Sequence, residues 1–566
     1  MDFWQRTVLD ELEVAADVSD RGFGFIGERG AEEFVPFATL VGDVRRRAAA
    51  LAASGIGRGA RLGIIIPGNR AFITTFLAGL VAGAVPVPMY PPMGAVRIER
   101  WMETVLGILQ RACVTAVVCE PDIARLLQPA LAELGTRAVT VEQLKACEDA
   151  PFHAVKASAS ELAFLQFTSG STAAPRGVRV THGNIAANCG AIVHQLLHGM
   201  HVVGASWLPL YHDMGLIGFV LAPLFGRHSV FFLDTLAFMR RPTRWFDVIH
   251  RERATVTFSP NFGYALATRC VTDRDLARWD LSCVKVLGCG AEPISAGTLR
   301  AFTERFAPTG LQRNAFRPCY GMAEATLLVT SGKVSDAWQS DVVDAEVLRD
   351  SGEAVSNDAA TQRLEVVGCG APLPGHAVRI LDAQGQPVVE RVVGEIEFSG
   401  PSRTEGYFSD PECTAQSYRG DRLLTGDLGY LANGELFVTG RKKELIIVNG
   451  RNYAPQSIEW SVGAVDGVRM GHAVAFAVPD PRGSEAVVLV CESNKPAAAL
   501  IAAIRDRVLD DTGLTLGDVV IVRPGTLPRT SSGKLQRLKA RSLYLSEALT
   551  GSRAPNDLLE GSTEGP

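Results

Sequence analysis

The sequence lacks the charge imbalance and the cysteine spacing that mark several large functional classes. Its 56 Lys and Arg residues nearly balance 61 Asp and Glu residues, so the net charge is only −5 and there is no basic footprint for nucleic acid. Its 11 cysteines are scattered without a C-x-x-C pair, which disfavours structural zinc and predicts reduced thiols in a cytoplasmic protein. The first residues carry acidic side chains and no apolar core segment, so no signal peptide is expected.

A membrane-spanning helix is also missing from the pattern. Residues 71–96 contain no charge, but the four prolines between residues 86 and 92 would break a spanning helix. We therefore predict a buried helix that ends near Gly83, a strand after it, and no stable membrane insertion. The chain contains no G-x-S-x-G, H-E-x-x-H or G-x-D-S-L motif, which leaves hydrolase, metalloprotease and fused-carrier functions without support.

What is present is a large apolar fraction, arranged as alternating strands and helices. With 566 residues, 47% of them hydrophobic, the chain predicts more than one core. Continuous apolar strands that alternate with helices indicate parallel sheets covered on both faces. The predicted fold is α/β, with a large N-terminal domain of layered, mostly parallel α/β subdomains, a small β-rich unit, and a smaller C-terminal α/β domain. The expected boundaries are 1–441 for the N-terminal domain, with a candidate insertion at 333–366 and the β-rich unit at about 367–441, then 442–548 for the C-terminal domain and 549–566 for a disordered tail.

Two glycine-containing patterns have different meanings. Gly22, Gly24 and Gly27 satisfy G-x-G-x-x-G, but no helix pattern follows them, so a hairpin is predicted there. The stretch LQFTSGSTAAPRG at 165–177 runs from an apolar strand into small and hydroxylated residues, which let main-chain N–H groups approach phosphate oxygens. Pro175 stands where a Walker A loop needs glycine, so a different nucleotide chemistry is expected. Taken alone, this stretch could equally be a surface turn.

The loops at the other strand ends decide between these readings, because ligands bind beyond the carboxyl ends of strands in open α/β sheets. Seven motifs resemble, in the same order, those of the adenylate-forming superfamily of acyl-CoA synthetases, peptide-synthetase adenylation domains and luciferases. They are FTSGSTAAPRG, YHDMGL, CGAEP, CYGMAEAT, TGDLGY, GRKKELIIVNGRNYAPQSIE and PRTSSGKLQR, and they span nearly the whole chain. The forms YPP at 90–92, LPLYHDMGLIG, CGAEPI and CYGMAEATL look most like fatty acyl-AMP ligases.

This resemblance implies an ATP- and Mg²⁺-dependent ligase that activates a medium- or long-chain fatty acid as acyl-adenylate plus pyrophosphate. The acyl group would pass to the phosphopantetheine thiol of a separate acyl carrier protein, after rotation of a mobile C-terminal domain about Lys443. The resemblance assigns phosphate binding to Thr168, Ser169, Gly170, Ser171, Thr172 and Arg176, and adenine and ribose binding to Gly290, Ala291, Glu292, Tyr320, Gly321, Met322, Ala323, Asp427 and Arg441. It implies catalytic roles for Lys534, Glu324 and His212, magnesium binding by Glu324 and Thr168, and an acyl pocket at Trp207, Asp213, Met214 and Ile217.

The residue chemistry agrees with these implied roles. A carboxylate such as Asp427 can accept hydrogen bonds from both ribose hydroxyls. The ammonium of Lys534 can stabilise the charge that develops while a carboxylate attacks the α-phosphate. Magnesium prefers few carboxylates together with phosphate oxygens, so Glu324 is sufficient as the one acidic ligand. Arg176 departs from the family, which usually has lysine at this position. The arginine keeps the positive charge but replaces a compact ammonium with a planar guanidinium.

Two other functions remain open from the sequence. A long-chain acyl-CoA ligase would share the first step and use CoA as acceptor. The segment 333–366 favours the carrier protein instead, since in fatty acyl-AMP ligases an insertion near this point is associated with impaired use of CoA. A catalytically inactive regulator that binds lipid or nucleotide is the second alternative, and the intact Glu324, Asp427, Arg441 and Lys534 argue against it.

Overall fold

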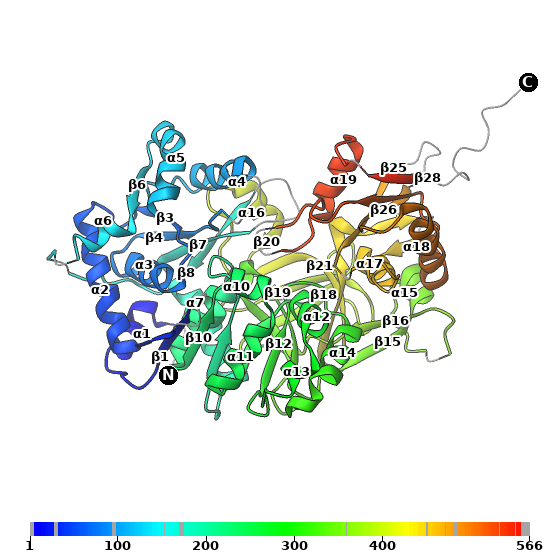
Figure 1. Cartoon of the computed structure of the whole chain (residues 1–566), viewed down its shortest axis with the longest axis horizontal. Coiled ribbons are helices and arrows are strands. Elements are labelled where there is room, and N and C mark those ends of the chain that lie inside the picture. The colour runs from blue at the N-terminus through cyan, green and yellow to red at the C-terminus, as the bar shows by residue number, and fades with distance from the viewer. Residues whose placement is uncertain are drawn as a thin grey trace, which may run out of the picture.

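Two large sheets, a β-rich unit and a C-terminal domain make up the fold (Figure 1). The computed structural model describes residues 5–27, 32–92, 98–148, 150–151, 153–168, 175–357, 359–448, 451–469, 471–479, 485–530, 533–549 and 551–555. Parallel sheets covered by helices occupy the first two thirds of the chain, and a smaller α/β unit follows. The predicted α/β fold class is confirmed.

The largest sheet has nine strands, and its central strands are parallel. In spatial order they are β17 (Ala371–Pro372), β14 (Leu328–Ser331), β13 (Phe316–Gly321), β12 (Val286–Cys289), β11 (Val256–Ser259), β9 (Val203–Ser206), β10 (Ser229–Leu233), β1 (Gly22–Ile26) and β2 (Glu32–Pro36). The antiparallel pair β1–β2 is the hairpin predicted from the glycine pattern. The carboxyl ends of β11, β12 and β13 therefore meet at one edge, where loops can form a site.

Helices cover both faces of this sheet, and two of them continue as π-helical turns. The helices are α1 (Val8–Ala15), α7 (His182–Ile192), η2 (Val193–Leu197), α8 (Asp213–Leu216), η3 (Ile217–Leu221), α9 (Ala222–Gly226), α10 (Thr235–Arg240), α11 (Thr243–Glu252), α12 (Asn261–Cys270), α13 (Asp273–Leu276), α14 (Ala296–Phe306), η4 (Ala307–Thr309) and η5 (Ala323–Ala325). The π-helical turns η2 and η3 follow α7 and α8 directly. Such turns widen a helix locally and are frequent at functional sites.

The second sheet has four parallel strands and forms the left side of Figure 1. Its order is β4 (Val85–Pro88), β3 (Arg61–Ile65), β5 (Ala116–Cys119) and β6 (Arg137–Thr140), with helices α2 (Phe37–Ala53), α3 (Asn69–Val81), α4 (Ile98–Arg111), α5 (Pro121–Glu133) and α6 (Val141–Lys145). Among the strands that the structure describes, β4 pairs only with β3, so its two prolines occupy an edge strand that tolerates the missing N–H groups. Within the described ranges, no helix is long and apolar enough to cross a membrane.

A separate hairpin lies beside β4 and carries the predicted phosphate loop. Its strands are β7 (Leu162–Thr168) and β8 (Arg176–Thr181), and Thr168 pairs with Arg176 at the end that is next to the connecting loop. The loop residues 169–174 lie outside the described residues. The hairpin therefore fixes the two residues that flank this loop, Thr168 and Arg176.

The β-rich unit contains a five-stranded sheet made of β18 (Ala377–Leu381), β19 (Gly394–Ser399), β20 (Tyr418–Arg419), β21 (Arg422–Ala432) and β22 (Glu435–Arg441), with helix α16 (Pro411–Ser417). Asp427 and Arg441 face each other across β21 and β22. The candidate insertion at 333–366 contains a pair of strands, β15 (Ser340–Asp344) and β16 (Arg363–Val367), with α15 (Ala345–Ser351) between them. The few apolar side chains of this segment form a small core with Tyr430 and Phe437, two residues that lie far away in the sequence.

The C-terminal domain, which we call the lid, follows the short helix η6 (Lys442–Glu444). Its elements are β23 (Ile446–Val448), β24 (Arg451–Tyr453), α17 (Pro455–Gly463), β25 (Ala473–Pro479), β26 (Glu485–Glu492), α18 (Ala497–Thr512), β27 (Asp518–Val522), α19 (Arg537–Leu545) and β28 (Ser552–Pro555). The prediction of a disordered tail from residue 549 was wrong for its first part, because β28 pairs with β27 and Leu549 is buried. Residues 556–566 lie outside the described residues.

Candidate active site

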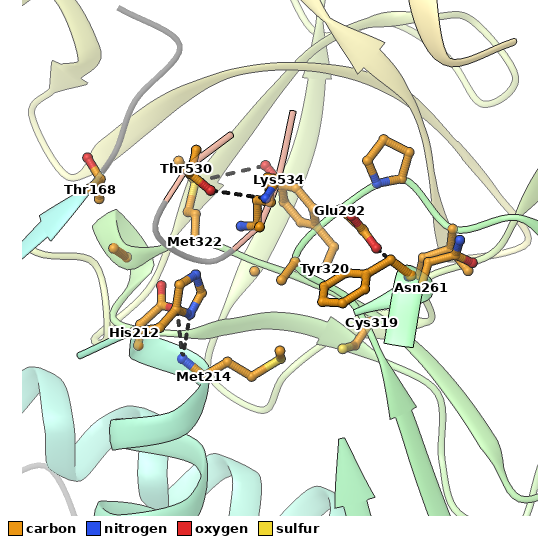
Figure 2. A pocket seen from close by; sticks show the side chains of 18 of the residues that line it. Thr168, His212, Met214, Asn261, Glu292, Cys319, Tyr320, Met322, Thr530 and Lys534 are labelled. Atoms are coloured by element: carbon orange, nitrogen blue, oxygen red, sulfur yellow. Dashed lines mark hydrogen bonds and ion pairs between the residues drawn. The ribbon is translucent and has the colours of Figure 1, made fainter. Parts of the chain in front are cut away.

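A single cavity of about 1640 Å³ lies where the strand ends of the large sheet meet the β-rich unit and the lid. Figure 2 shows Lys534, Glu292, Tyr320 and His212 around this space. Most of the predicted site residues line it, although they come from widely separated parts of the chain. The predicted residues in its lining are Thr168, Arg176, Trp207, His212, Asp213, Met214, Ala291, Glu292, Tyr320, Gly321, Met322, Ala323, Glu324, Asp427, Arg441, Lys443 and Lys534.

Several predicted residues are not part of this lining. Gly290 is buried behind it, where an added Cβ would come within 2.8 Å of the Cys319 Sγ. The prediction for Ile217 was wrong: its side chain is fully buried in the core, and Gly218 and Phe219 line the cavity instead. Ile217 is the first residue of the π-helical turn η3, and the two residues after it line the cavity. Ser169, Gly170, Ser171 and Thr172 lie outside the described residues.

Asp427 forms a hydrogen-bonded group with Tyr320 and Arg441. The Tyr320 hydroxyl donates to Asp427 Oδ2 at 2.8 Å, and Arg441 Nε donates to Oδ1 at 2.8 Å. Burial, and then the negative charge of Asp427, raise the pKa of Tyr320, so its phenol stays protonated as a donor. A carboxylate offers about four lone-pair sites, so each oxygen of Asp427 keeps one for a further donor such as a ribose hydroxyl.

Glu324 lies in η5, shortly after β13, and both its main chain and its side chain accept hydrogen bonds. Its main-chain carbonyl accepts hydrogen bonds from Thr404 N at 2.9 Å and from Thr404 Oγ1 at 3.0 Å. Its side-chain Oε1 accepts a hydrogen bond from the Tyr407 hydroxyl at 2.8 Å. Burial raises the pKa of the Glu324 carboxyl, which means that a cation in the cavity would favour its ionised form. Tyr407 is a cavity residue that the sequence reasoning missed.

Lys534 enters the cavity from the lid and is hydrogen-bonded to Thr530. Thr530 N donates to the Lys534 carbonyl at 2.8 Å, and Lys534 N donates to Thr530 Oγ1 at 3.1 Å (Figure 2). Burial lowers the pKa of the Lys534 ammonium, while the carboxylates of Asp213 and then Glu292 oppose that fall. The lysine is therefore a cavity residue that faces acidic groups of the large domain, not a solvated surface residue.

Glu292 and the His212–Asp213 pair supply the acidic groups that face Lys534. Glu292 Oε1 accepts a hydrogen bond from Phe262 N at 2.6 Å, and burial raises the pKa of its carboxyl. Asp213 Oδ1 lies 2.6 Å from His212 Nδ1 and accepts a hydrogen bond from Met214 N at 2.7 Å. Burial alone would raise the pKa of Asp213, but His212 and then Lys534 lower it overall. Asp213 therefore stays ionised beside the lysine.

An apolar extension of the cavity runs down one face of the large sheet. Its lining includes Leu196 and Leu197 of η2, Gly218 and Phe219 of η3, and strand residues Gly204, Val230, Val256 and Phe258. Trp207 lines its upper part and stacks on Phe238, with ring centroids 3.8 Å apart. No periodicity in the sequence signalled the two π-helical turns, and only the backbone reveals them. The extension is suited to an alkyl chain.

Comparisons with known proteins agree with this arrangement. The family model for AMP-binding enzymes matches residues 28–408, and a model described as the AMP domain of Disco-interacting protein 2-like proteins matches residues 443–553. A protein of Caulobacter vibrioides whose name places it with the acyl-CoA synthetases is 37% identical over 555 residues, which is 95% of each chain.

Two further relatives have names that bear on the substrate. The Moorena producens medium-chain-fatty-acid–[acyl-carrier-protein] ligase JamA is 32% identical over 87% of this chain and 87% of its own length. A solved structure from studies of fatty acyl-adenylate ligases of E. coli and L. pneumophila has a TM-score of 0.91 and 35% identity, and covers 96% of this chain and 99% of that chain.

Proposed function

The chain belongs to the AMP-binding enzyme family, and we propose that it is a fatty acyl-AMP ligase that uses an acyl carrier protein as acceptor. In the first step a fatty acid carboxylate attacks the α-phosphate of ATP, which gives acyl-adenylate and pyrophosphate. In the second step the phosphopantetheine thiol of the carrier displaces AMP. The observation that supports this proposal is one cavity that joins Lys534, Glu324 and Asp427 to an apolar extension.

The geometry gives each of these residues a task in the first step. Asp427 and Arg441 would hold the ribose, beside the wall formed by Tyr320. The ammonium of Lys534 would bridge the fatty acid carboxylate and the α-phosphate, where negative charge accumulates while pyrophosphate leaves. His212 would border the carboxylate from the opposite side of the cavity.

Magnesium fits the oxygen donors that face this cavity. Glu324 offers one carboxylate and Thr168 offers a hydroxyl, and Mg²⁺ prefers such a sparse protein donor set, completed by phosphate oxygens and water. The bound ion would neutralise charge on the β- and γ-phosphates. Arg176 would contact the same phosphates from β8 and keeps the positive charge that lysine supplies in other members of the family.

The direct test is fatty-acid-dependent exchange of pyrophosphate into ATP, followed by a product assay with CoA and a holo carrier protein side by side. We expect exchange with medium- or long-chain acids and acylation of the carrier in preference to CoA. Absence of exchange at every chain length, with folded protein, would favour the inactive regulator. Preferential acylation of CoA would favour the long-chain acyl-CoA ligase instead.

The segment β15–α15–β16 supports the carrier acceptor because it contacts the lid. Arg349 Nη1 donates to the Thr512 carbonyl at 2.8 Å, and its guanidinium lies 5.1 Å from the Tyr453 ring centroid. Asp350 forms a salt bridge with Arg451 at 2.9 Å. Rotation of the lid about Lys443, which we propose as the hinge, would have to break these contacts. They would therefore hinder the rearrangement that lets a thiol enter.

Replacing Arg349 with alanine tests this contact. We expect acyl-CoA formation to rise about two- to fivefold, because the cation–π contact is worth about 0.5–1 kcal/mol at such a half-exposed site. Adenylate formation should stay unchanged, since Arg349 does not line the cavity. Arg363→Ala is the matched control, because Arg363 is an exposed arginine on β16 of the same segment. Unchanged use of CoA by Arg349→Ala would remove this support for the carrier acceptor.

A further inference from the structure

Tyr407 joins two charged residues of the candidate site that come from different parts of the chain. Its backbone runs alongside β8: Phe408 N donates to the Gly177 carbonyl at 2.7 Å, and Arg179 N donates to the Gly406 carbonyl at 3.0 Å. Tyr407 itself forms an antiparallel bridge with Val178. Tyr407 is therefore fixed to the same strand that begins with Arg176.

The side chain of Tyr407 contacts both charged groups at once. The guanidinium of Arg176 lies over its ring, 5.3 Å from the centroid. Its hydroxyl donates to Glu324 Oε1 at 2.8 Å. An arginine stacks on an aromatic face better than a lysine does, which gives the unusual Arg176 a structural partner. Burial, and then the charge of Glu324, raise the pKa of Tyr407, so its hydroxyl remains a donor.

A second tyrosine holds this arrangement in place. The Tyr418 ring meets the Tyr407 ring edge to face, with centroids 6.0 Å apart. The Tyr418 hydroxyl lies within hydrogen-bond distance of Thr404 Oγ1, at 2.7 Å, and Thr404 in turn donates to the Glu324 carbonyl. The Tyr407 ring therefore contacts a second aromatic ring as well as Arg176, which limits its freedom to rotate.

We propose that Tyr407 is a positioning residue that fixes Arg176 and Glu324 relative to each other for ATP bound with Mg²⁺. By donating to Oε1, the hydroxyl orients the Glu324 carboxylate, which would serve as the one acidic ligand that Mg²⁺ prefers beside phosphate oxygens. The ring also holds the guanidinium of Arg176, which would contact the phosphates of the same nucleotide. This inference rests on the nucleotide site of the proposed function and adds a residue with no previous role in it.

Two substitutions separate the hydroxyl from the ring. Tyr407→Phe keeps the ring beneath Arg176 and removes the hydrogen bond to Glu324. We expect the Mg²⁺ concentration for half-maximal ATP binding to rise about tenfold, as for the loss of a hydrogen bond to a charged group. Tyr407→Leu removes both contacts and should also weaken ATP binding about threefold at saturating Mg²⁺. Both effects are measured by calorimetric titration of ATP at fixed Mg²⁺ concentrations, without fatty acid and without turnover.

Two controls show whether the effect is specific. AMP lacks the β- and γ-phosphates, so its affinity should be the same in all variants. Tyr544→Phe removes a hydroxyl that donates to the Asp518 carboxylate within the lid, outside the cavity lining, and should leave the Mg²⁺ dependence of ATP binding unchanged. An unchanged Mg²⁺ midpoint in Tyr407→Phe, or an equal loss of AMP binding, would overturn the proposal.

The outcome is independent of the choice of acyl substrate. If the wild-type protein binds ATP and Tyr407→Phe shifts the Mg²⁺ midpoint, the positioning role stands even where no fatty acid supports pyrophosphate exchange. If the wild-type protein binds no ATP at any Mg²⁺ concentration, the positioning role and the proposed function both fail.

Discussion

Lys534→Ala is expected to slow fatty acyl-adenylate formation by about 100-fold or more, because the role proposed for its ammonium is to stabilise the charge that develops on the α-phosphate. Acyl transfer from a supplied acyl-adenylate should stay within about threefold of wild type, since the α-phosphate has already been attacked when that step begins. The two steps differ because Lys534 reaches the cavity from the lid. The lid rotation proposed above would carry the lysine out of the cavity before the second step.

Separate measurement of the two steps checks this expectation. Fatty-acid-dependent pyrophosphate exchange reports the first step, and single-turnover transfer from synthetic acyl-adenylate to a holo carrier protein reports the second. Lys539→Ala is the matched control, because Lys539 lies on α19 outside the cavity lining, five residues further along the same segment. Equal loss of both steps in Lys534→Ala would show that the lysine does not act on adenylation alone.

Local sequence patterns predicted much of the fold correctly, because the backbone preferences of proline and glycine act over a few neighbouring residues. Prolines in 86–92 excluded a spanning helix, and Pro86 and Pro88 are found in an edge strand. The glycine pattern at 22–27 lacked a following helix pattern and forms a hairpin. Most of the predicted site residues line one cavity, since motifs at neighbouring strand ends converge wherever the sheet is parallel.

The features that the sequence missed depend on distant partners. The order of the segment 333–366 comes from apolar contacts with Tyr430 and Phe437 of the β-rich unit. β28 forms by pairing with the edge of β27. The polar sequence of β28 does not by itself indicate a strand. Tyr407 acquires its contacts through strand pairing with β8. Ile217 was assigned to the acyl pocket from the family resemblance, whereas its side chain at the start of η3 packs in the core.

Gly204→Val is expected to restrict the enzyme to fatty acids with shorter chains. Gly204 pairs with Val230 on one neighbouring strand and with Val256 on the other, so the three residues form one row across β10, β9 and β11. All three line the apolar extension of the cavity. Gly204 precedes Trp207 by three residues. At roughly 3.3 Å per residue, the row therefore lies about 10 Å from Trp207 along the strand direction.

The missing side chain of Gly204 keeps the cavity open at this depth. An added Cβ would lie 3.0 Å from Val230 Cγ2 and 3.6 Å from Phe219 Cδ1, so a valine there would fill the passage between the sheet and η3. We expect kcat/KM for acids long enough to pass the row to fall about 10- to 100-fold, as when a pocket loses room for a methylene group or more. Shorter acids should stay within about twofold of wild type.

The opposite substitution in the same row separates cavity depth from a loss of stability. Val230→Ala removes volume where Gly204→Val adds it, and should therefore move the preference toward longer acids. General destabilisation would lower activity with every acid in both variants, whereas a change in depth moves the two chain-length profiles in opposite directions. Pyrophosphate exchange measured over a series of saturated fatty acids distinguishes these results. If both variants lose activity in parallel at all chain lengths, the row does not limit the acyl chain, and the end of the cavity lies elsewhere along its lining.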